Sequence, residues 1–251
     1  MIHFVGAGPG APDLITVRGK TLLEQADVII YAGSLVNPVL LDNAKADCMI
    51  LNSAGMTLEE VISVLVEAEQ CGKTAIRLHT GDPSIFGAIR EQMDLLREKG
   101  IPFDVVPGVS SFCGAAAALQ AEYTLPGVSQ TVILTRMAGR TPVPEPESIR
   151  LLAAHGASMV IFLSAGMLGK LREELLAGGY APDTPAAVVF KATWPEEKVL
   201  RGTVDKLPEL AGEYGIGKTA LILVGHFLGE DYQRSLLYDP GFSHGFRESK
   251  V

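Results

Sequence analysis

Three short apolar runs in the first half of the chain each end in a turn rich in glycine and proline. The runs and their turns are Ile2–Val5 with Gly6–Gly10, Ala75–Leu78 with Thr80–Ser84, and Phe103–Val106 with Pro107–Ser111. Short apolar runs separated by helical segments are typical of buried strands in an α/β sheet. Ligands of open α/β sheets bind beyond the carboxyl ends of the strands. We therefore expect the three turns to meet at one sheet edge and to form a cradle for a ligand.

The alternation of strands and helices continues along the chain and restarts after Ala121–Gln130. Helical periodicity is clearest after Thr57, which has the capping-box spacing with Glu60. We expect two α/β domains with largely parallel or mixed sheets, comprising residues 1–122 and 123–251. The other expected strands are Asp27–Tyr31, Thr131–Leu134, Met159–Leu163, Ala186–Phe190 and Ala220–Val224, and Val199–Val204 is expected to continue as a strand or a hairpin. The other expected helices are Val17–Ala26, Ile85–Lys99, Ala115–Leu119, Ile149–Ala154, Leu168–Ala177 and Leu207–Tyr214.

The composition indicates a globular protein and argues against two classes of partner. Apolar residues make up 47% of the chain and charged residues 20%, which is unlike a disordered chain. The net charge is −8, from 21 Lys and Arg against 29 Asp and Glu. A nucleic-acid-binding face and a basic membrane-binding surface both need clustered cations, so we expect neither nucleic acid nor a membrane as a partner.

The sequence also favours a cytoplasmic location. The N-terminus begins with the strand-like Met1–Gly6 and has no basic region, so we expect no signal peptide. The apolar stretch Val28–Leu41 is interrupted by Asn37 and Pro38 and is too short for a membrane span.

The spacing of cysteine and histidine argues against a disulfide framework and against a metal site. The three cysteines (Cys48, Cys71 and Cys113) are far apart and odd in number, which fits buried thiols in a reducing compartment. The five histidines show neither HxxH nor HxxxH spacing. We therefore expect no metal ion.

The first turn begins like a dinucleotide-binding loop but departs from it. Gly6, Gly8 and Gly10 start a GxGxxG pattern whose third glycine comes one residue early, which disfavours a nicotinamide-binding oxidoreductase. A tight strand-to-helix connection explains such a turn equally well. In the second turn, Asp82 is suited to accept hydrogen bonds from a ribose hydroxyl or an amino group. In the third turn, Ser110 and Ser111 are suited equally to cap a helix.

Taken together, the three turns resemble one known family. Their motifs read Gly6-Ala7-Gly8-Pro9-Gly10, Gly81-Asp82-Pro83-Ser84-Ile85-Phe86-Gly87 and Val105-Val106-Pro107-Gly108-Val109-Ser110-Ser111. In this order and at this spacing they resemble the tetrapyrrole (corrin/porphyrin) methyltransferases. The resemblance covers the whole chain. It implies the tetrapyrrole methylase fold, with the active-site cleft between two α/β domains, and a homodimer.

Four further motifs resemble the branch of this family that methylates C-11 of the corrin ring in cobalamin biosynthesis. They are Tyr31–Val36, Gly139–Glu145, Lys191–Lys198 and the tail Tyr238–Arg247. This resemblance implies methyl transfer to precorrin-4 or to its cobalt-containing counterpart, and the motifs do not separate the two. The alternatives are another methylase of the same fold, acting on uroporphyrinogen III or a different ring carbon, and a non-catalytic tetrapyrrole-binding protein.

The resemblance implies S-adenosylmethionine as the cofactor. By motif position, its contacts in the first domain are Pro9, Thr80, Gly81, Asp82, Ile85, Ser110 and Ser111. From the second domain, Leu163 and Ala192 are expected to complete the pocket. Relatives often carry methionine at the first of these positions and some carry glycine at the second, so we expect both residues to contribute backbone and shape.

The implied tetrapyrrole substrate is an anion, and an acidic protein must gather cations locally to bind it. We expect Arg136, Arg140 and Lys191 to bind its carboxylates, with a solvated surface charge as the alternative for each. Weaker candidates near expected strand ends are Arg77, Arg90 and Lys198. Trp194 is expected to brace the hairpin rather than to pack on the macrocycle. No nucleophilic triad or general base is evident, which suits a reaction whose electrophile the cofactor activates.

Overall fold

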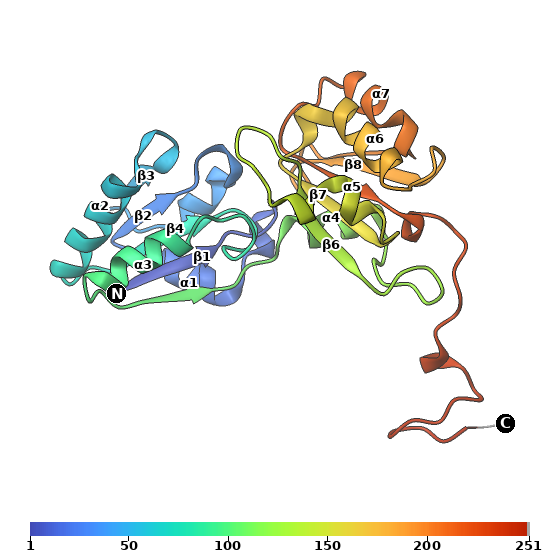
Figure 1. Cartoon of the computed structure of the whole chain (residues 1–251). Helices are drawn as coiled ribbons and strands as arrows, with labels where there is room; N and C mark the ends of the chain where they lie inside the picture. Colours follow the sequence, from blue (N-terminus) through green and yellow to red (C-terminus); the bar gives the residue numbers. More distant parts are fainter. Residues whose placement is uncertain (250–251) are drawn as a thin grey trace. The chain divides into compact units, whose positions relative to one another are not determined.

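The computed structural model describes residues 1–249, apart from the side chain of Ser34. The chain divides into two compact units, each with its own sheet (Figure 1). The first unit comprises Met1–Ala115 together with Ala192–Glu196, and the second comprises Ala116–Lys191 and the chain from Glu197 onward. The division expected after residue 122 includes no such return of a later segment to the first unit.

The first unit is built on an all-parallel sheet. Its strands are β1 (Ile2–Gly6), β2 (Val28–Tyr31), β3 (Met49–Asn52), β4 (Ala75–His79) and β5 (Phe103–Val106). Their order is β3-β2-β4-β1-β5, so that β4 and β5 flank β1. Every residue of β4 is buried, as in a central strand whose sheet is covered on both faces. This order brings the carboxyl ends of β4, β1 and β5 side by side.

Helices cover both faces of the first sheet. Helices α2 (Leu58–Gln70) and α3 (Arg90–Glu98) pack on the face that carries Phe4 and Ile30 (Figure 1). Helix α1 (Val17–Gln25) packs on the opposite face. The two faces carry separate cores because successive strand residues point to opposite sides of the sheet.

The beginnings of α2 and α3 show how local chemistry sets helix boundaries. The capping box is confirmed: Thr57 Oγ1 accepts a hydrogen bond from Glu60 N, and Glu60 Oε2 accepts one from Thr57 N (2.7 Å). The helix expected from Ile85 begins only at Arg90. Phe86 and Ala88 adopt left-handed backbone angles, with φ of 55° and 51°, which a right-handed helix does not contain.

The edge strand β3 lies where the sequence predicted no strand. Its residues Met49–Asn52 are mostly exposed and pair only with β2. Such a short edge strand carries neither the alternation of a half-buried strand nor the length of a core strand, so periodicity does not reveal it.

The second unit is built on a mixed sheet. Its strands are β6 (Val132–Arg136), β7 (Ser158–Phe162), β8 (Pro185–Phe190), β9 (Lys198–Thr203) and β10 (Ala220–Val224). Their order is β6-β7-β10-β8-β9. Strands β6 and β7 are parallel, whereas β10 is antiparallel to β7 and β8, and β9 is antiparallel to β8. One parallel and one mixed sheet confirm the expected fold class.

Three helices share one core with the second sheet: α5 (Ile149–Ala153), α6 (Leu168–Ala177) and α7 (Leu207–Gly212). Helix α4 (Ser111–Leu119) contains the unit boundary, because its first half belongs to the first unit and its second half to the second. Within residues 1–249, no helix is both long and apolar enough to cross a membrane.

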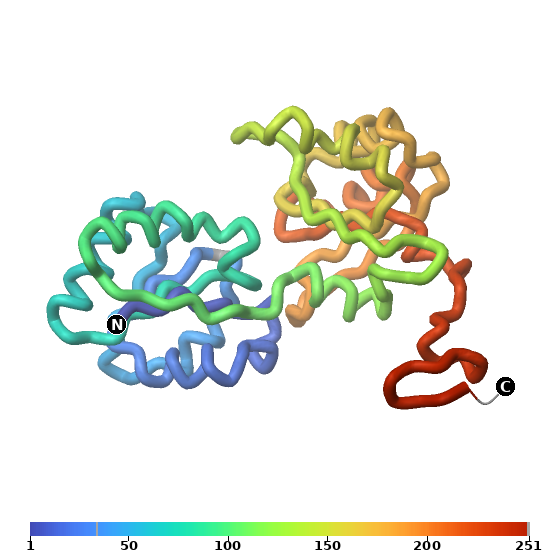
Figure 2. The backbone as a smooth tube through the Cα atoms, turned by 60° about the horizontal axis from the view of Figure 1, so that its bottom comes forward, coloured from blue at the N-terminus to red at the C-terminus, as the bar shows by residue number. Residues whose placement is uncertain are grey.

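The C-terminal segment of the second unit folds back on itself (Figure 2). The Arg247 guanidinium donates hydrogen bonds to the carbonyl oxygens of Leu237 (2.8 Å) and Asp239 (2.6 Å) and so closes the turn. Tyr238 and Phe246 are exposed on this segment.

Candidate functional site

The carboxyl ends of β4, β1 and β5 are joined by hydrogen bonds. Gly8 N donates to Gly81 O (3.2 Å) and Gly81 N donates to Gly8 O (2.8 Å), which ties the β1 turn to the β4 turn. Gly108 N, in the β5 turn, donates to Asp82 Oδ2 (2.8 Å). The three turns therefore meet at one sheet edge, as the sequence predicts. We call them the strand-end cradle, comprising Gly6–Ala11, Thr80–Ile85 and Pro107–Ser111.

Glycine is required at the centre of the strand-end cradle because the turns approach one another closely. A methyl group at Gly108 would lie 2.2 Å from Gly81 O, and one at Gly6 would lie 2.5 Å from Gly108 Cα. Backbone atoms cannot move aside as a flexible side chain does. The centre of the cradle is consequently packed backbone, and the missing side chains of Gly6 and Gly108 are what let the turns approach one another.

Asp82 joins the β4 turn to the β5 turn. Its Oδ1 accepts hydrogen bonds from Ser84 N (2.8 Å) and Ser84 Oγ, and its Oδ2 accepts the one from Gly108 N. Burial acts to raise the pKa of Asp82, but the hydrogen bonds from Ser84 and Gly108 outweigh it and lower the pKa below its usual value. A carboxylate has about four lone-pair sites. The ionised Asp82 therefore holds the cradle together and keeps an acceptor site for a ligand.

The remaining predicted cofactor contacts of the first half of the chain lie in the same cradle. Pro9 and Ser110 are buried, whereas Thr80, Ile85 and Ser111 are partly exposed. Ser111 is the first residue of α4, and Ser110 O accepts a hydrogen bond from Cys113 N (3.0 Å). The serine pair thus lies at the start of a helix, and its contact with a cofactor stays a prediction.

Leu163 follows β7 in the second unit and has a strained backbone. Its φ is 53° and its side chain is 64% exposed, an unusual combination for a leucine at a strand end. The buried Ser164 fixes the backbone next to Leu163. Its Oγ donates a hydrogen bond to Phe162 O (2.7 Å) and accepts one from Met137 N (3.0 Å). An exposed, strained apolar residue is suited to contact a ligand.

Ala192 was expected from the second domain, but it belongs to the first unit. It is buried, and its neighbours Lys191 and Thr193 have left-handed φ angles of 46° and 68°. The segment Ala192–Glu196 contacts the β1 turn of the strand-end cradle. The structure therefore places Ala192 in the same unit as the cradle.

The three predicted substrate-binding cations differ in what they contact. Arg136 donates hydrogen bonds to the carbonyl oxygens of Met137, Thr141 and Pro142, and so holds its own loop closed. The Lys191 ammonium lies 5.8 Å from the centre of the Phe190 ring.

Arg140 lies exposed in that loop. Within the described residues it forms no hydrogen bond or ion pair, so it is better suited than Arg136 to bind a carboxylate. Binding of the substrate by any of the three stays a prediction.

Two buried basic side chains in β4, Arg77 and the neutral His79, were not singled out as a pair by the sequence. Arg77 donates to Ile30 O and to Gln92 Oε1 (3.1 Å each), so it is not free to bind a substrate carboxylate. Burial lowers the pKa of Arg77 to about 10. His79 is 3% exposed, its ring stacks on Phe4, and its Nε2 has no hydrogen-bond partner among the described residues.

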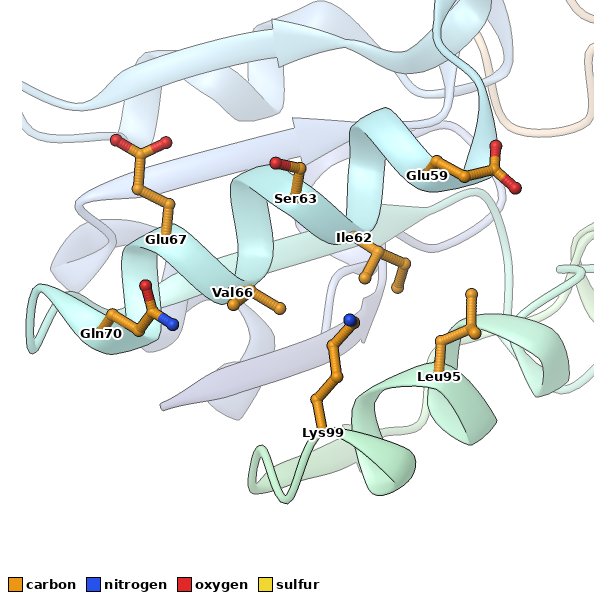
Figure 3. Close-up of a pocket in the computed structure, with 8 residues that line it drawn as sticks. All are labelled: Glu59, Ile62, Ser63, Val66, Glu67, Gln70, Leu95 and Lys99. Carbon is orange, nitrogen blue, oxygen red and sulfur yellow. The ribbon is translucent and has the colours of Figure 1, made fainter.

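A groove of about 420 Å³ lies between α2 and α3, and no residue of the strand-end cradle lines it (Figure 3). Ile62, Val66 and Leu95 form its apolar part, and Glu59 and Lys99 stand at its sides. It contains none of the predicted site residues. Among the described residues, no group of three or more His, Cys, Asp or Glu is placed to hold a metal ion.

Comparison with known proteins identifies the family. Residues 1–208 match the family described as Tetrapyrrole (Corrin/Porphyrin) Methylases, and the chain belongs to it. A cobalt-precorrin-4 C(11)-methyltransferase of Methanocaldococcus jannaschii is 54% identical over 99% of this chain and 96% of that protein. A precorrin-4 C(11)-methyltransferase of Pseudomonas aeruginosa is 47% identical over 98% of each chain.

Solved structures show the same fold. The X-ray structure of a cobalamin biosynthetic enzyme, cobalt precorrin-4 methyltransferase, has a TM-score of 0.89 at 48% identity and covers 91% of this chain and 96% of its own. A uroporphyrin-III C-methyltransferase from Thermus thermophilus, complexed with S-adenosylhomocysteine, has a TM-score of 0.75 at 25% identity and covers 90% of this chain and 92% of its own. The expected family and fold are confirmed.

His79 makes the first unit sensitive to acid. Burial first, and the charge of Arg77 second, lower the pKa of His79 from 6.5 to about 3. Between pH 6.5 and about pH 3, the unfolded chain binds a proton at His79 that the folded chain does not. The effect of His79 on the free energy of unfolding is therefore absent above pH 6.5 and becomes more destabilising as the pH falls towards 3. Between pH 6 and 4, we expect wild type to lose stability relative to His79→Leu by about 1.4 kcal/mol per pH unit.

Urea denaturation at several pH values measures this difference. His155→Gln, at an exposed histidine, is the control and should follow wild type. Parallel pH profiles for wild type and His79→Leu would contradict the prediction.

Proposed function

We propose that this chain transfers a methyl group from S-adenosylmethionine to C-11 of precorrin-4 or cobalt-precorrin-4. The observation that carries the proposal is the 54% identity, over nearly the whole chain, to a cobalt-precorrin-4 C(11)-methyltransferase. Relatives named for the metal-free and the cobalt-containing substrate are both similar over nearly their full length. The proposal therefore includes both substrates.

The strand-end cradle suits S-adenosylmethionine better than a dinucleotide. Its three segments contain no Lys, Arg or His, and Asp82 is their only acid. A pyrophosphate needs cations or helix N–H groups, whereas a sulfonium cation with a ribose and an adenine needs acceptors and close backbone approach. The ionised Asp82 offers an acceptor, and the packing of Gly6 against Gly108 holds the backbone of the turns close together. When bound, S-adenosylmethionine supplies a methyl group that is already activated.

The residues of this chain then have to position the two reactants rather than to activate a nucleophile. In-line transfer needs the methyl carbon and the accepting carbon about 3–3.5 Å apart, in a site that excludes water. The hydrogen bonds between Gly8 and Gly81 and between Asp82 and Gly108 fix the cradle before any ligand arrives. The exposed, strained Leu163 is proposed to contribute an apolar contact to the cofactor.

The proposed substrate carries several carboxylates, and Arg140 and Lys191 are proposed to bind them.

We also propose that the protein works as a homodimer in the cytoplasm. Size-exclusion chromatography with light scattering measures the oligomeric state.

A labelled-methyl assay tests the proposal. Purified protein receives S-adenosylmethionine labelled in its methyl group and, in parallel reactions, metal-free and cobalt-containing precorrin-4. We expect label in the product of at least one reaction, and NMR should place the new methyl group at C-11. Methylation at another carbon, or tetrapyrrole binding without any transfer, would refute the proposal.

Asp82→Ala should weaken the binding of S-adenosylmethionine. The substitution removes the acceptor for a ligand and the bond to Gly108 N, and breaking a buried polar contact costs about 1–3 kcal/mol. Isothermal titration calorimetry should therefore show the Kd raised by roughly 5- to 150-fold. Ser84→Ala is the control because it removes one hydrogen bond to Asp82 but keeps the carboxylate. An unchanged Kd for Asp82→Ala would make Asp82 a turn residue only.

Arg140→Ala should raise the KM for the tetrapyrrole by about tenfold, as expected for the loss of one charge-assisted hydrogen bond. The Kd for S-adenosylmethionine should stay within about twofold, because Arg140 lies outside the strand-end cradle. Arg150→Ala, at an exposed arginine in α5, is the matched control. Equal losses of affinity for both ligands would indicate misfolding instead of a lost substrate contact.

A further inference from the structure

The segment that follows β8 is strained where it enters the first unit. Lys191 and Thr193 have φ angles of 46° and 68°, in the left-handed region that favours glycine. Each such residue costs about 1–3 kcal/mol, and a β-branched threonine there is a genuine outlier. Strain of this kind persists only where the surrounding contacts compensate for it. We call the five residues Ala192–Glu196 the strap.

The compensating contacts join the strap to the β1 turn. Thr193 Oγ1 accepts a hydrogen bond from Ala11 N (2.9 Å). Trp194 Nε1 donates one to Pro9 O (3.1 Å). The two hydrogen bonds therefore attach the strap to the β1 turn at the residues before and after Gly10.

The absence of a side chain at Gly10 makes room for the strap. A methyl group at Gly10 would lie 2.0 Å from Trp194 Cδ1, so the indole occupies the place that a side chain would need. The backbone of Gly10 also has a φ of 158°. On its other side, Gly10 O accepts a hydrogen bond from Nδ2 of the buried Asn37 (2.8 Å).

Helix α4 supports the same turn. A methyl group at Gly114 would lie 2.9 Å from Pro9 Cβ and 3.2 Å from Thr193 Cγ2. The pyrrolidine ring of Pro9 and the methyl group of Thr193 therefore both lie against the helix at Gly114. Strap, helix and Asn37 together hold Pro9, Gly10 and Ala11.

We propose that the strap positions the β1 turn for the cofactor, with Thr193 and Trp194 as positioning residues. This inference rests on the proposed function, because the ligand concerned is S-adenosylmethionine. The carbonyl of Pro9, the carbonyl of Gly10 and the N–H of Ala11 are all used by the chain. The orientation of these peptide groups is thus set before binding, which lowers the ordering cost when a ligand arrives. Thr193 and Trp194 act through the turn, without touching the reacting atoms.

Two substitutions of Thr193 separate the hydrogen bond from the shape of the side chain. Thr193→Val keeps the branched shape and loses the acceptor for Ala11 N, whereas Thr193→Ser keeps the acceptor. By calorimetry with S-adenosylmethionine, we expect Thr193→Val to raise the Kd about tenfold and Thr193→Ser to stay within about twofold of wild type. Trp194→Phe, which lacks the N–H donor, should also raise the Kd about tenfold.

Steady-state kinetics distinguish positioning from general damage. Thr193→Val and Trp194→Phe should raise the KM for S-adenosylmethionine and leave the KM for the tetrapyrrole unchanged. An equal rise in both KM values, or a Kd for S-adenosylmethionine equal to that of wild type, would overturn the inference.

Trp194 also provides a direct readout, because it is the only tryptophan in the chain. Since its indole lies against Gly10, we expect its emission to change on addition of S-adenosylmethionine and to saturate with the Kd found by calorimetry. Calorimetric binding without any emission change would overturn the inference and leave the proposed function standing. Failure of wild type to bind S-adenosylmethionine in calorimetry would refute the proposed function itself.

Discussion

The close approach of three backbone turns at one sheet edge is the constraint on which the rest of the first unit depends. Gly6 and Gly108 lie so near each other and the carbonyl oxygen of Gly81 that a side chain fits at neither of them. That contact requires β4 and β5 to flank β1, which the parallel order of the sheet provides. The hydrogen bond from Gly108 N to Asp82 Oδ2 then fixes the Asp82 carboxylate beside the β5 turn. The order of the strands, the glycines in the turns and the position of the Asp82 carboxylate thus depend on one another.

The electrostatics of the first unit follow from burial more than from net charge. The chain is acidic overall, yet β4 buries Arg77 and His79 on the same face. Burial lowers the pKa of both, and Gln92 and a main-chain carbonyl solvate the guanidinium in place of a carboxylate. Asp82 is the opposite case, since its hydrogen bonds outweigh burial. An acidic total charge therefore says little about the charge at a particular site.

The sequence predicted most of the elements, and the strand-end turns that form the cradle, because both depend on local pattern. Turns with the spacing of Gly81-Asp82-Pro83 follow buried strands, and parallel strands place such turns at one edge. Long-range contacts left no comparable signal. The contact of Trp194 with Gly10 joins residues far apart in the chain, and the hydrogen bond from Asn37 to Gly10 depends on where a loop passes. Phe86, which precedes the late start of α3, has a left-handed φ that local preference does not favour for phenylalanine, so the sequence pattern did not predict it.

The return of the strap to the first unit has a consequence for synthesis on the ribosome. A protein made from its N-terminus normally completes its first domain while the second is still being translated. Here the first unit lacks Thr193 and Trp194 until Glu196 has been made, by which time most of the second sheet already exists as chain. The β1 turn therefore receives its last contacts late. The first unit is completed only after much of the second unit has been synthesised. Cutting the gene between them would leave the earlier unit permanently unfinished.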